Sequence, residues 1–311
     1  MKEIGNQYSK DDTMDKTGFR KRARLHQSKY RAEVLNVDYC RDEGDDYGNR
    51  LSKDDGLKGL NFYNGFSIFD EVQKRNKNKY DKGLHSDMLR SEHTPFNLFV
   101  PFRQDKVFAT KVFNDFFDNT IESIYISDDF NKFIEYAPSP RKKYLNDGTS
   151  FDTYIEYTHK DGGKGIIGIE VKYTEHEYPL KKGSKEEAYV ELECSPYYKI
   201  SEQSGIYKPN SFSELKSDLL RQIWRNHLLG ESILIADSSE FKYFTSLTIF
   251  PSGNTHFVET SKKYIELLHN NDKKFLPVTY EQFLSSCRKH CPTSKDFFDW
   301  LDYLTQRYIV A

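Results

Sequence analysis

The clearest pattern of apolar and polar positions predicts a β-hairpin near the middle of the chain. Residues 151–158 are rich in Phe, Tyr, Ile and Thr, which suit a pleated strand. Residues 160–163 read Lys-Asp-Gly-Gly, which is typical of a hairpin turn. Residues 165–173 begin with a nearly continuous apolar run, which is typical of a central strand buried on both faces.

Helical periodicity and further apolar runs predict the rest of the fold. The stretch 106–117 has the apolar spacing of a core helix, and a second helix begins at Ser213 and ends at Gly230. A helix capped by Ser86 or Asp87 is expected to run through Glu92. Further strands are expected at 121–126, 233–236 and 243–250, and further helices at 128–136, 279–291 and 293–310. This order predicts an α/β fold, with a mixed central sheet flanked by helices.

The N-terminal part of the chain has a weaker pattern. Residues 1–30 are polar and carry a basic cluster that continues to residue 31, a composition typical of a disordered tail or of an arm that contacts phosphates. The cluster consists of Arg20, Lys21, Arg22, Arg24, Lys29 and Arg31. Residues 32–82 are irregular and interrupted by glycines. We therefore expect residues 1–84 to decorate a main domain formed by residues 85–311.

The second strand of the hairpin carries two charges where a buried strand should avoid them. Glu170 and Lys172 are two residues apart and project from one face, whereas Ile169 and Val171 project from the other. Burying a charge costs several kcal/mol unless it is paired or binds a metal. The alternative is a surface hairpin with an ordinary ion pair on a wet face.

A site for a hard cation explains these charges. Mg²⁺ is bound by carboxylate and carbonyl oxygens, and Asp152, Glu170 and the Val171 carbonyl could supply them. Lys172 would then orient or deprotonate an attacking water, or stabilise a pentavalent phosphate. After the hairpin, Glu175 and Glu177 either support this site or are exposed.

The shared metal sets a condition on the hairpin register. Asp152 and Glu170 lie on one face only if paired residue numbers sum to an even number, which requires an odd loop or a bulge. A three-residue loop at 161–163 would set Asp152 opposite Lys172 and diagonal to Glu170. The same register brings Glu156 to this face, opposite Gly168, as a spare ligand.

At these residues the chain resembles a known family. Asp152, followed after the hairpin by Glu170-Val171-Lys172, resembles the signature of the PD-(D/E)xK nucleases, with Phe151 in place of the usual proline. The strings LRSEHTPFNLFVPF, GIEVKYTE and QIWRNHLLG are similar to bacterial proteins described as candidate restriction endonucleases. The similarity covers roughly residues 85–250. It implies a restriction-endonuclease-like fold.

The resemblance also implies roles outside the hairpin. It assigns to Glu92 a further carboxylate at the metal site, with an exposed glutamate as the alternative. It assigns to Gln222 the role of orienting the catalytic Lys172. Gln222, Arg225 and Asn226 fall on one face of the helix that contains them, which is otherwise an ordinary solvated face.

Substrate contacts are expected from basic residues near the hairpin. Arg225 could clamp a phosphate through two hydrogen bonds. Arg141, Lys142 and Lys143 form a basic loop shortly before Asp152 and are candidate phosphate contacts.

Charge and composition restrict the remaining possibilities. The 311 residues include 46 Lys and Arg against 48 Asp and Glu, so any nucleic-acid surface must be a local patch. The sequence has no apolar run long enough for a membrane span and no signal-peptide pattern, so we expect a cytoplasmic protein with no membrane partner. Cys287, His290 and Cys291 suggest zinc, but the second pair of ligands is absent, which favours incidental thiols on a helix.

These observations lead to one main hypothesis and two alternatives. The main hypothesis is an Mg²⁺-dependent endonuclease, with Mn²⁺ as a substitute, that cleaves DNA in restriction or phage defence, either as a monomer or as a homodimer. The defence role rests on the resemblance alone, and the choice between DNA and RNA stays open. One alternative is an inactive nuclease fold that serves as a nucleic-acid-binding or assembly module. The other is a structural protein with a chance Glu-x-Lys.

Overall fold

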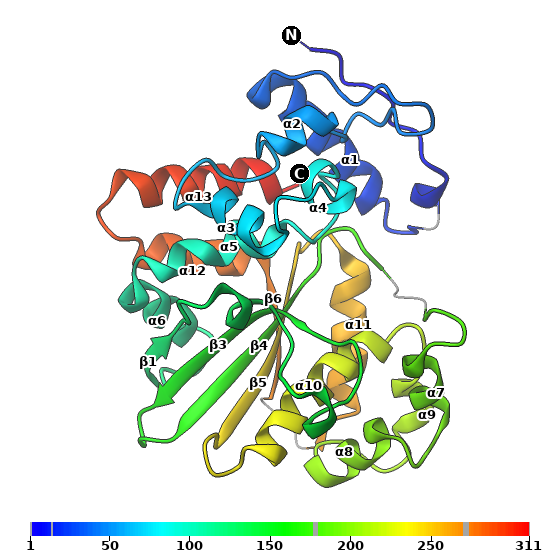
Figure 1. The fold of residues 1–311 in the computed structure, drawn as a ribbon, viewed down its shortest axis with the longest axis vertical. Helices are drawn as coiled ribbons and strands as arrows, with labels where there is room; N and C mark the ends of the chain where they lie inside the picture. The colour runs from blue at the N-terminus through cyan, green and yellow to red at the C-terminus, as the bar shows by residue number, and fades with distance from the viewer. Residues whose placement is uncertain (1, 14, 177–179, 270–273, 311) are drawn as a thin grey trace.

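A six-stranded mixed sheet forms the centre of the protein (Figure 1). The computed structural model describes residues 2–13, 15–176, 180–269 and 274–310. The strand order is β1-β3-β4-β5-β6, with β2 beside β3, and the β4–β5 and β5–β6 pairs are parallel. The strands are β1 (Ile121–Tyr125), β2 (Ile134–Tyr136), β3 (Phe151–His159), β4 (Lys164–Val171), β5 (Tyr243–Phe250) and β6 (Phe275–Thr279). The predicted α/β fold is confirmed.

Helices cover both faces of this sheet. Figure 1 shows α6 and α12 on one side and α10 and α11 on the other. The helices are α1 (Phe19–Lys29), α2 (Lys53–Leu57), α3 (Ile68–Arg75), α4 (Lys82–Ser86), α5 (Thr94–Phe99), α6 (Lys106–Asn114), α7 (Lys185–Glu191), α8 (Pro196–Ser204), α9 (Phe212–Leu215), α10 (Arg221–Ala236), α11 (Thr255–Glu266), α12 (Tyr280–His290) and α13 (Lys295–Tyr308). Among the described residues, no helix combines the length and apolar character that crossing a bilayer requires.

The two faces of β4 pack into different apolar clusters. Ile167, Ile169 and Val171 are fully buried in the cluster that contains the side chains of α6, α12 and α13. Ile166, on the other face, belongs to the cluster formed with α10 and α11. Each cluster fills one layer between sheet and helices, so β4 is buried on both sides, as its apolar run predicts.

The hairpin register meets the predicted condition with a loop one residue earlier than expected. The pairs run from Thr153 with Ile169 to Thr158 with Lys164, and the His159 N–H donates to the Gly163 carbonyl at 2.8 Å. The loop is therefore the three residues 160–162. Gly162 has φ +84°, the left-handed conformation that such a loop requires.

This shift by one residue changes which side chains meet. The register, continued by one residue beyond Thr153, sets Asp152 beside Glu170 and not opposite Lys172. It also pairs Glu156 with Ile166, so the predicted position of Glu156 opposite Gly168 was wrong. The change brings the two carboxylates closer than the diagonal arrangement would have done.

The N-terminal segment is a folded part of the structure, and the expectation of a disordered tail was wrong. Phe19 and Ala23 of α1 are fully buried in the same cluster as the sheet face under α6 and α12. Two residues of the basic cluster are buried with protein partners. The Arg24 Nε and Nη2 atoms donate to Asp12 at 2.9 Å, and the Arg31 Nε donates to the Gly48 carbonyl at 2.8 Å. Residues before and after position 84, the predicted domain boundary, pack together in this apolar cluster.

Four local predictions were wrong. The expected helix from Ser213 is interrupted, since α9 ends at Leu215 and α10 begins at Arg221. Residues 233–236 continue α10 and form no strand, because Gly230 does not end the helix. A Cβ at Gly230 would lie 1.9 Å from the Phe244 ring, so this glycine permits close packing on β5. The expected helix at 128–136 is a 3-10 turn at 130–132 followed by β2. The expected helix through Glu92 is absent, since α4 ends at Ser86 and α5 begins at Thr94.

Candidate active site

The ends of β3 and β4 bring three charged side chains together. Lys172 Nζ lies 2.6 Å from Glu170 Oε1, and the Val171 N–H donates to Asp152 Oδ2 at 2.7 Å. Glu170 and Lys172 are 7% and 5% exposed, whereas Asp152 is half-buried. The alternative of an ion pair on a wet hairpin face is therefore wrong. The site is a buried ion pair with one carboxylate that solvent can reach.

Helix α10 fixes the Glu170 carboxylate from the other side. Gln222 Nε2 donates to Glu170 Oε1 at 2.8 Å, and Asn226 Nδ2 donates to Oε2. Positions 222 and 226 are four residues apart and share a helix face. Gln222 and Lys172 thus bind the same carboxylate, and the role of Gln222 in orienting Lys172 stays a prediction.

The structure adds an acidic residue that the sequence did not reveal. Glu135 lies on β2, and the pairs of Ile134 with Thr153 and Tyr136 with Phe151 place it beside Asp152. Its φ is +52°, which is uncommon for any residue other than glycine. Arg75 Nη2 donates to the Glu135 carbonyl at 3.1 Å, which holds this backbone in place.

The electrostatics of the site show an excess of negative charge. Burial raises the pKa of Asp152 well above its usual value, and the nearby Glu170 and Glu135 carboxylates raise it further. Burial also raises the pKa of Glu135, against the opposing effect of Arg75 and with a further contribution from Glu170. Burial disfavours the charge on Lys172, but Glu170 and Asp152 outweigh it and raise the pKa of this lysine. Lys172 therefore keeps its proton, and the carboxylates lack full compensation.

Comparison with known proteins identifies the family. The family model of the PD-(D/E)XK nuclease superfamily matches residues 10–310. The chain belongs to the PD-(D/E)XK nuclease superfamily. The curated proteins and the solved structures gave no match. The superfamily generally consists of nucleases, which act on nucleic acid and typically use divalent metals, although members without activity occur. The match includes α1, so the N-terminal helix is part of what the superfamily model describes.

The residues of the site fit the divalent metal that is typical of the superfamily. Asp152 and Glu170 are adjacent oxygen donors, and burial together with the nearby Glu170 and Glu135 carboxylates raises the pKa of Asp152. Among the described residues, no three or more His, Cys, Asp or Glu side chains are spaced to hold a metal together. The side chains of Asp152 and Glu170 would therefore form only part of the ligand set of a cation here.

Glu92 lies at the margin of the candidate metal site. It stands in the turn before α5, its side chain is 40% exposed, and its Oε1 is 2.9 Å from Arg90 Nη2. Its charge contributes to the raised pKa of Glu135, which places it on the Glu135 side of the site. Its role as a metal ligand stays a prediction.

Glu175 supports the end of β4. Its Oε2 accepts the N–H groups of Tyr173 and Thr174 at 3.0 and 3.1 Å, and its Oε1 accepts the Ser91 N–H at 2.7 Å. It thereby joins the turn that contains Glu92 to the chain directly after Lys172. Glu177 lies outside the described residues.

The predicted phosphate contacts divide into buried and exposed residues. Arg225 is buried, and its Nη2 binds Thr149 Oγ1 at 2.9 Å and Asp147 Oδ2 at 3.4 Å. The structure thus gives Arg225 the task of holding the loop before β3. Its predicted use as a phosphate clamp would require these bonds to break.

The basic loop before β3 is accessible. Arg141, Lys142 and Lys143 form an exposed 3-10 turn, in which Lys143 pairs with Asp237. Arg141 and Lys142 are the exposed basic side chains of this turn that stay candidates for contact with substrate phosphates.

Proposed function

We propose that this protein is a metal-dependent endonuclease that hydrolyses phosphodiester bonds in DNA. The observation that carries the proposal is the buried pair of Glu170 and Lys172 beside Asp152. A fold needs no such group for its stability, because buried ion pairs are often no better than apolar side chains. Their presence at the end of a central strand therefore indicates a functional site.

Each residue has a defined task in this proposal. Asp152, Glu170 and the Val171 carbonyl would hold Mg²⁺, or Mn²⁺ in its place, and Glu135 adds negative charge next to them. When bound, the metal supplies charge stabilisation at the phosphate and a water that loses its proton easily. Lys172 would stabilise negative charge on the phosphate, because Glu170 and Asp152 raise its pKa and favour its charged form. Gln222 and Asn226 keep the Glu170 oxygens oriented.

The biological setting follows from the resemblance to candidate restriction endonucleases. It supports a role in restriction or phage defence, with DNA as the substrate, in the cytoplasm. A homodimer would let two such sites cut both strands of a duplex. These parts of the proposal rest on the resemblance and on no contact in the structure.

Cleavage assays test the proposal directly. Plasmid DNA, single-stranded DNA and RNA are incubated with the protein in Mg²⁺, Mn²⁺ or EDTA. We expect cleavage of DNA with either metal and none in EDTA. The Glu170→Gln variant should be inactive, and Glu202→Gln, which changes an exposed glutamate of α8, should match the wild type. Metal-independent cleavage, or full activity in Glu170→Gln, would refute it.

One observation favours a second candidate, an inactive nuclease fold that binds nucleic acid. Lys172, Gln222 and Asn226 already satisfy the Glu170 carboxylate, which could then hold the fold together without a metal. Calorimetric titration with Mn²⁺ separates the two functions. Binding that Asp152→Asn weakens supports the nuclease. DNA binding with no metal binding and no cleavage supports the inactive module.

A further inference from the structure

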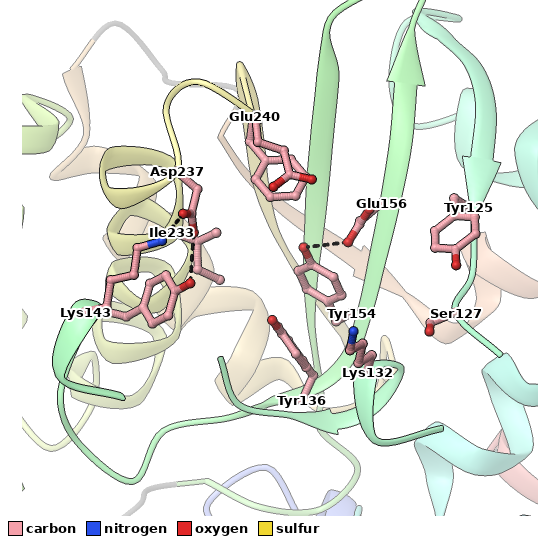
Figure 2. A pocket seen from close by; sticks show the side chains of 12 residues that line it. Tyr125, Ser127, Lys132, Tyr136, Lys143, Tyr154, Glu156, Ile233, Asp237 and Glu240 are labelled. Carbon is pink, nitrogen blue, oxygen red and sulfur yellow. Dashed lines mark hydrogen bonds and ion pairs between the residues drawn. The ribbon is translucent and has the colours of Figure 1, made fainter. Parts of the chain in front are cut away.

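A hollow opens on the α10 side of the sheet, apart from the Asp152 and Glu170 carboxylates. It encloses about 410 Å³, within the range of about 300–1,000 Å³ typical of small-ligand sites. Figure 2 shows Tyr136 and Tyr154 at its floor, Glu156 beside them, and Asp237 of the segment that follows α10 on the opposite wall. The residues to which the metal is assigned, Asp152, Glu170 and Val171, do not line it, whereas Glu156, expected as a spare ligand, does.

Tyrosine rings give the hollow flat apolar surfaces. The rings of Tyr136 and Tyr154 lie 4.3 Å apart between centroids, tilted by 37°. Tyr154 is buried and Tyr136 half-buried, whereas Tyr125 at the rim is 54% exposed. Burial and the neighbouring Tyr144 raise the pKa of Tyr136 to about 12, so its hydroxyl keeps its proton and can donate. Aromatic faces of this kind are what nucleic-acid-binding proteins use to stack bases.

The charge of the hollow distinguishes a base from a phosphate. Its acidic side chains are Glu156, Asp237 and Glu240, and its basic side chains are Lys132 and Lys143, of which Lys143 is already paired with Asp237. Tyr154 donates its hydroxyl to Glu156 Oε1 at 3.3 Å, which orients that carboxylate at the floor. With three carboxylates against two lysines, the lining disfavours a phosphate. An exocyclic amino group would be accepted, because carboxylates accept hydrogen bonds from the amino edge of a base.

The position of the hollow relates it to the reaction. Tyr136 directly follows Glu135 on β2, and Tyr154 is two residues from Asp152 on β3, about 7 Å along the strand. The hollow and Glu170 both lie on the α10 side of the sheet. A nucleotide next to the scissile phosphate could therefore place its base here.

We propose that this hollow is a subsite for an unstacked nucleobase that carries an exocyclic amino group. The base would come from a single strand or would leave the duplex stack, since a paired base cannot enter. It would stack on the Tyr136 and Tyr154 rings, and Glu156 would accept its amino hydrogens. Adenine, cytosine and guanine satisfy this requirement, and thymine does not. The inference rests on the proposed function, because it takes the strand held at Asp152 as its source of the base.

Binding measured without metal tests the subsite separately from catalysis. Fluorescence anisotropy follows short labelled oligo(dC), oligo(dT) and abasic strands added to the full protein in EDTA. We expect oligo(dC) to bind more tightly than oligo(dT). Tyr136→Leu should weaken oligo(dC) binding roughly tenfold, the effect of one lost base stack, and leave the abasic strand unchanged. Glu156→Gln should remove most of the preference for oligo(dC).

Two further variants keep the test decisive. Tyr8→Leu removes a tyrosine that is 68% exposed elsewhere and should bind like the wild type. If Tyr136→Leu does not fold, Tyr125→Ala at the exposed rim is the substitute, with a smaller loss of oligo(dC) binding expected. Equal binding of all strands by wild type and variants, or no binding at all, overturns the subsite. Lack of cleavage with these binding differences intact would refute the nuclease and leave the base subsite standing.

Discussion

The two faces of β4 bury side chains of different kinds near the end of the strand. On one face Ile167, Ile169 and Val171 are fully buried in an apolar cluster. On the other, Glu170 and Lys172 are buried almost as completely, but as charges. Burying an isoleucine stabilises a fold by about 1.5–3 kcal/mol, whereas burying an ion pair contributes little or nothing. One strand thus carries stability on one face and chemistry on the other.

The difference shows how the strand tolerates its charges. The apolar face packs β4 against α6 and α12. These contacts hold the backbone of β4 independently of the charged side chains on its other face. Mutations on the two faces should therefore separate folding from activity, and the following predictions test this separation.

The largest effect is expected at the charged face. Glu170→Gln keeps the shape of the side chain but removes a metal ligand, and Lys172→Met removes the charge near the phosphate. Each should lower the cleavage rate by about 10³-fold, since loss of one transition-state contact costs about 3–4 kcal/mol. Calorimetry should show weaker Mn²⁺ binding for Glu170→Gln and unchanged binding for Lys172→Met. Unchanged cleavage in either variant would remove that residue from the mechanism.

The opposite result is expected at the apolar face. Ile169→Ala leaves a cavity beside the α12 layer and should lower the free energy of unfolding by about 2–5 kcal/mol, measured by urea denaturation. Cleavage under conditions in which the variant is folded should stay within a few-fold of the wild type. A large loss of activity in the folded variant would show that the two faces are coupled.

A smaller effect on stability, opposite in sign to that of Ile169→Ala, is expected for Asp152→Asn. Its pKa is raised in the folded state, so the folded protein binds this proton more tightly than the unfolded chain. Stability should then fall as the pH rises above about 4, and Asp152→Asn should avoid this loss. We expect Asp152→Asn to be more stable by roughly 1 kcal/mol at neutral pH and to abolish cleavage.

Thermal unfolding measured across pH checks this expectation. The gain of Asp152→Asn over the wild type should vanish near pH 3 and shrink at neutral pH when Mg²⁺ is added, because the metal neutralises the wild-type carboxylate. A gain that does not depend on pH would assign the effect to another cause.

The smallest effect is expected at Gln222. Gln222→Ala removes one of the donors to Glu170 but leaves Asn226 and Lys172 in place. The loss of one hydrogen bond to a charged group, about 1.5 kcal/mol, predicts a roughly tenfold slower cleavage. The Mn²⁺ dependence should shift only slightly. A drop as large as that of Glu170→Gln would make Gln222 a direct participant.

The sequence was sufficient to predict the candidate site residues whose positions are determined within one hairpin. A charged pair after an apolar run is unusual in any fold, and the alternation of strand side chains then fixes which loops are allowed. These arguments led to Asp152, Glu170 and Lys172 and to the odd loop, which the register confirms. They gave the wrong loop position by one residue, because two adjacent glycines fit the left-handed position equally well from sequence.

The features that sequence analysis missed depend on packing between distant segments. Glu135 has a positive φ and lies on a strand of only three residues. A strand this short shows no recognisable alternation of apolar and polar residues in the sequence. Gly230 resembles a helix terminator, but its lack of a side chain is needed by Phe244 on another element.

The segment directly after the charged face has partners from both ends of the sequence. The Tyr280 hydroxyl donates to the Lys172 carbonyl at 2.8 Å, and Gln27 of α1 donates both to the Tyr173 hydroxyl and to the Arg307 carbonyl, each at 2.6 Å. During translation, residues 280 and 307 leave the ribosome long after Lys172 does. An incomplete chain lacks these supports, so we expect nascent and truncated copies to be poor nucleases. If the protein is the proposed nuclease, the order of synthesis alone would protect its host from unfinished copies.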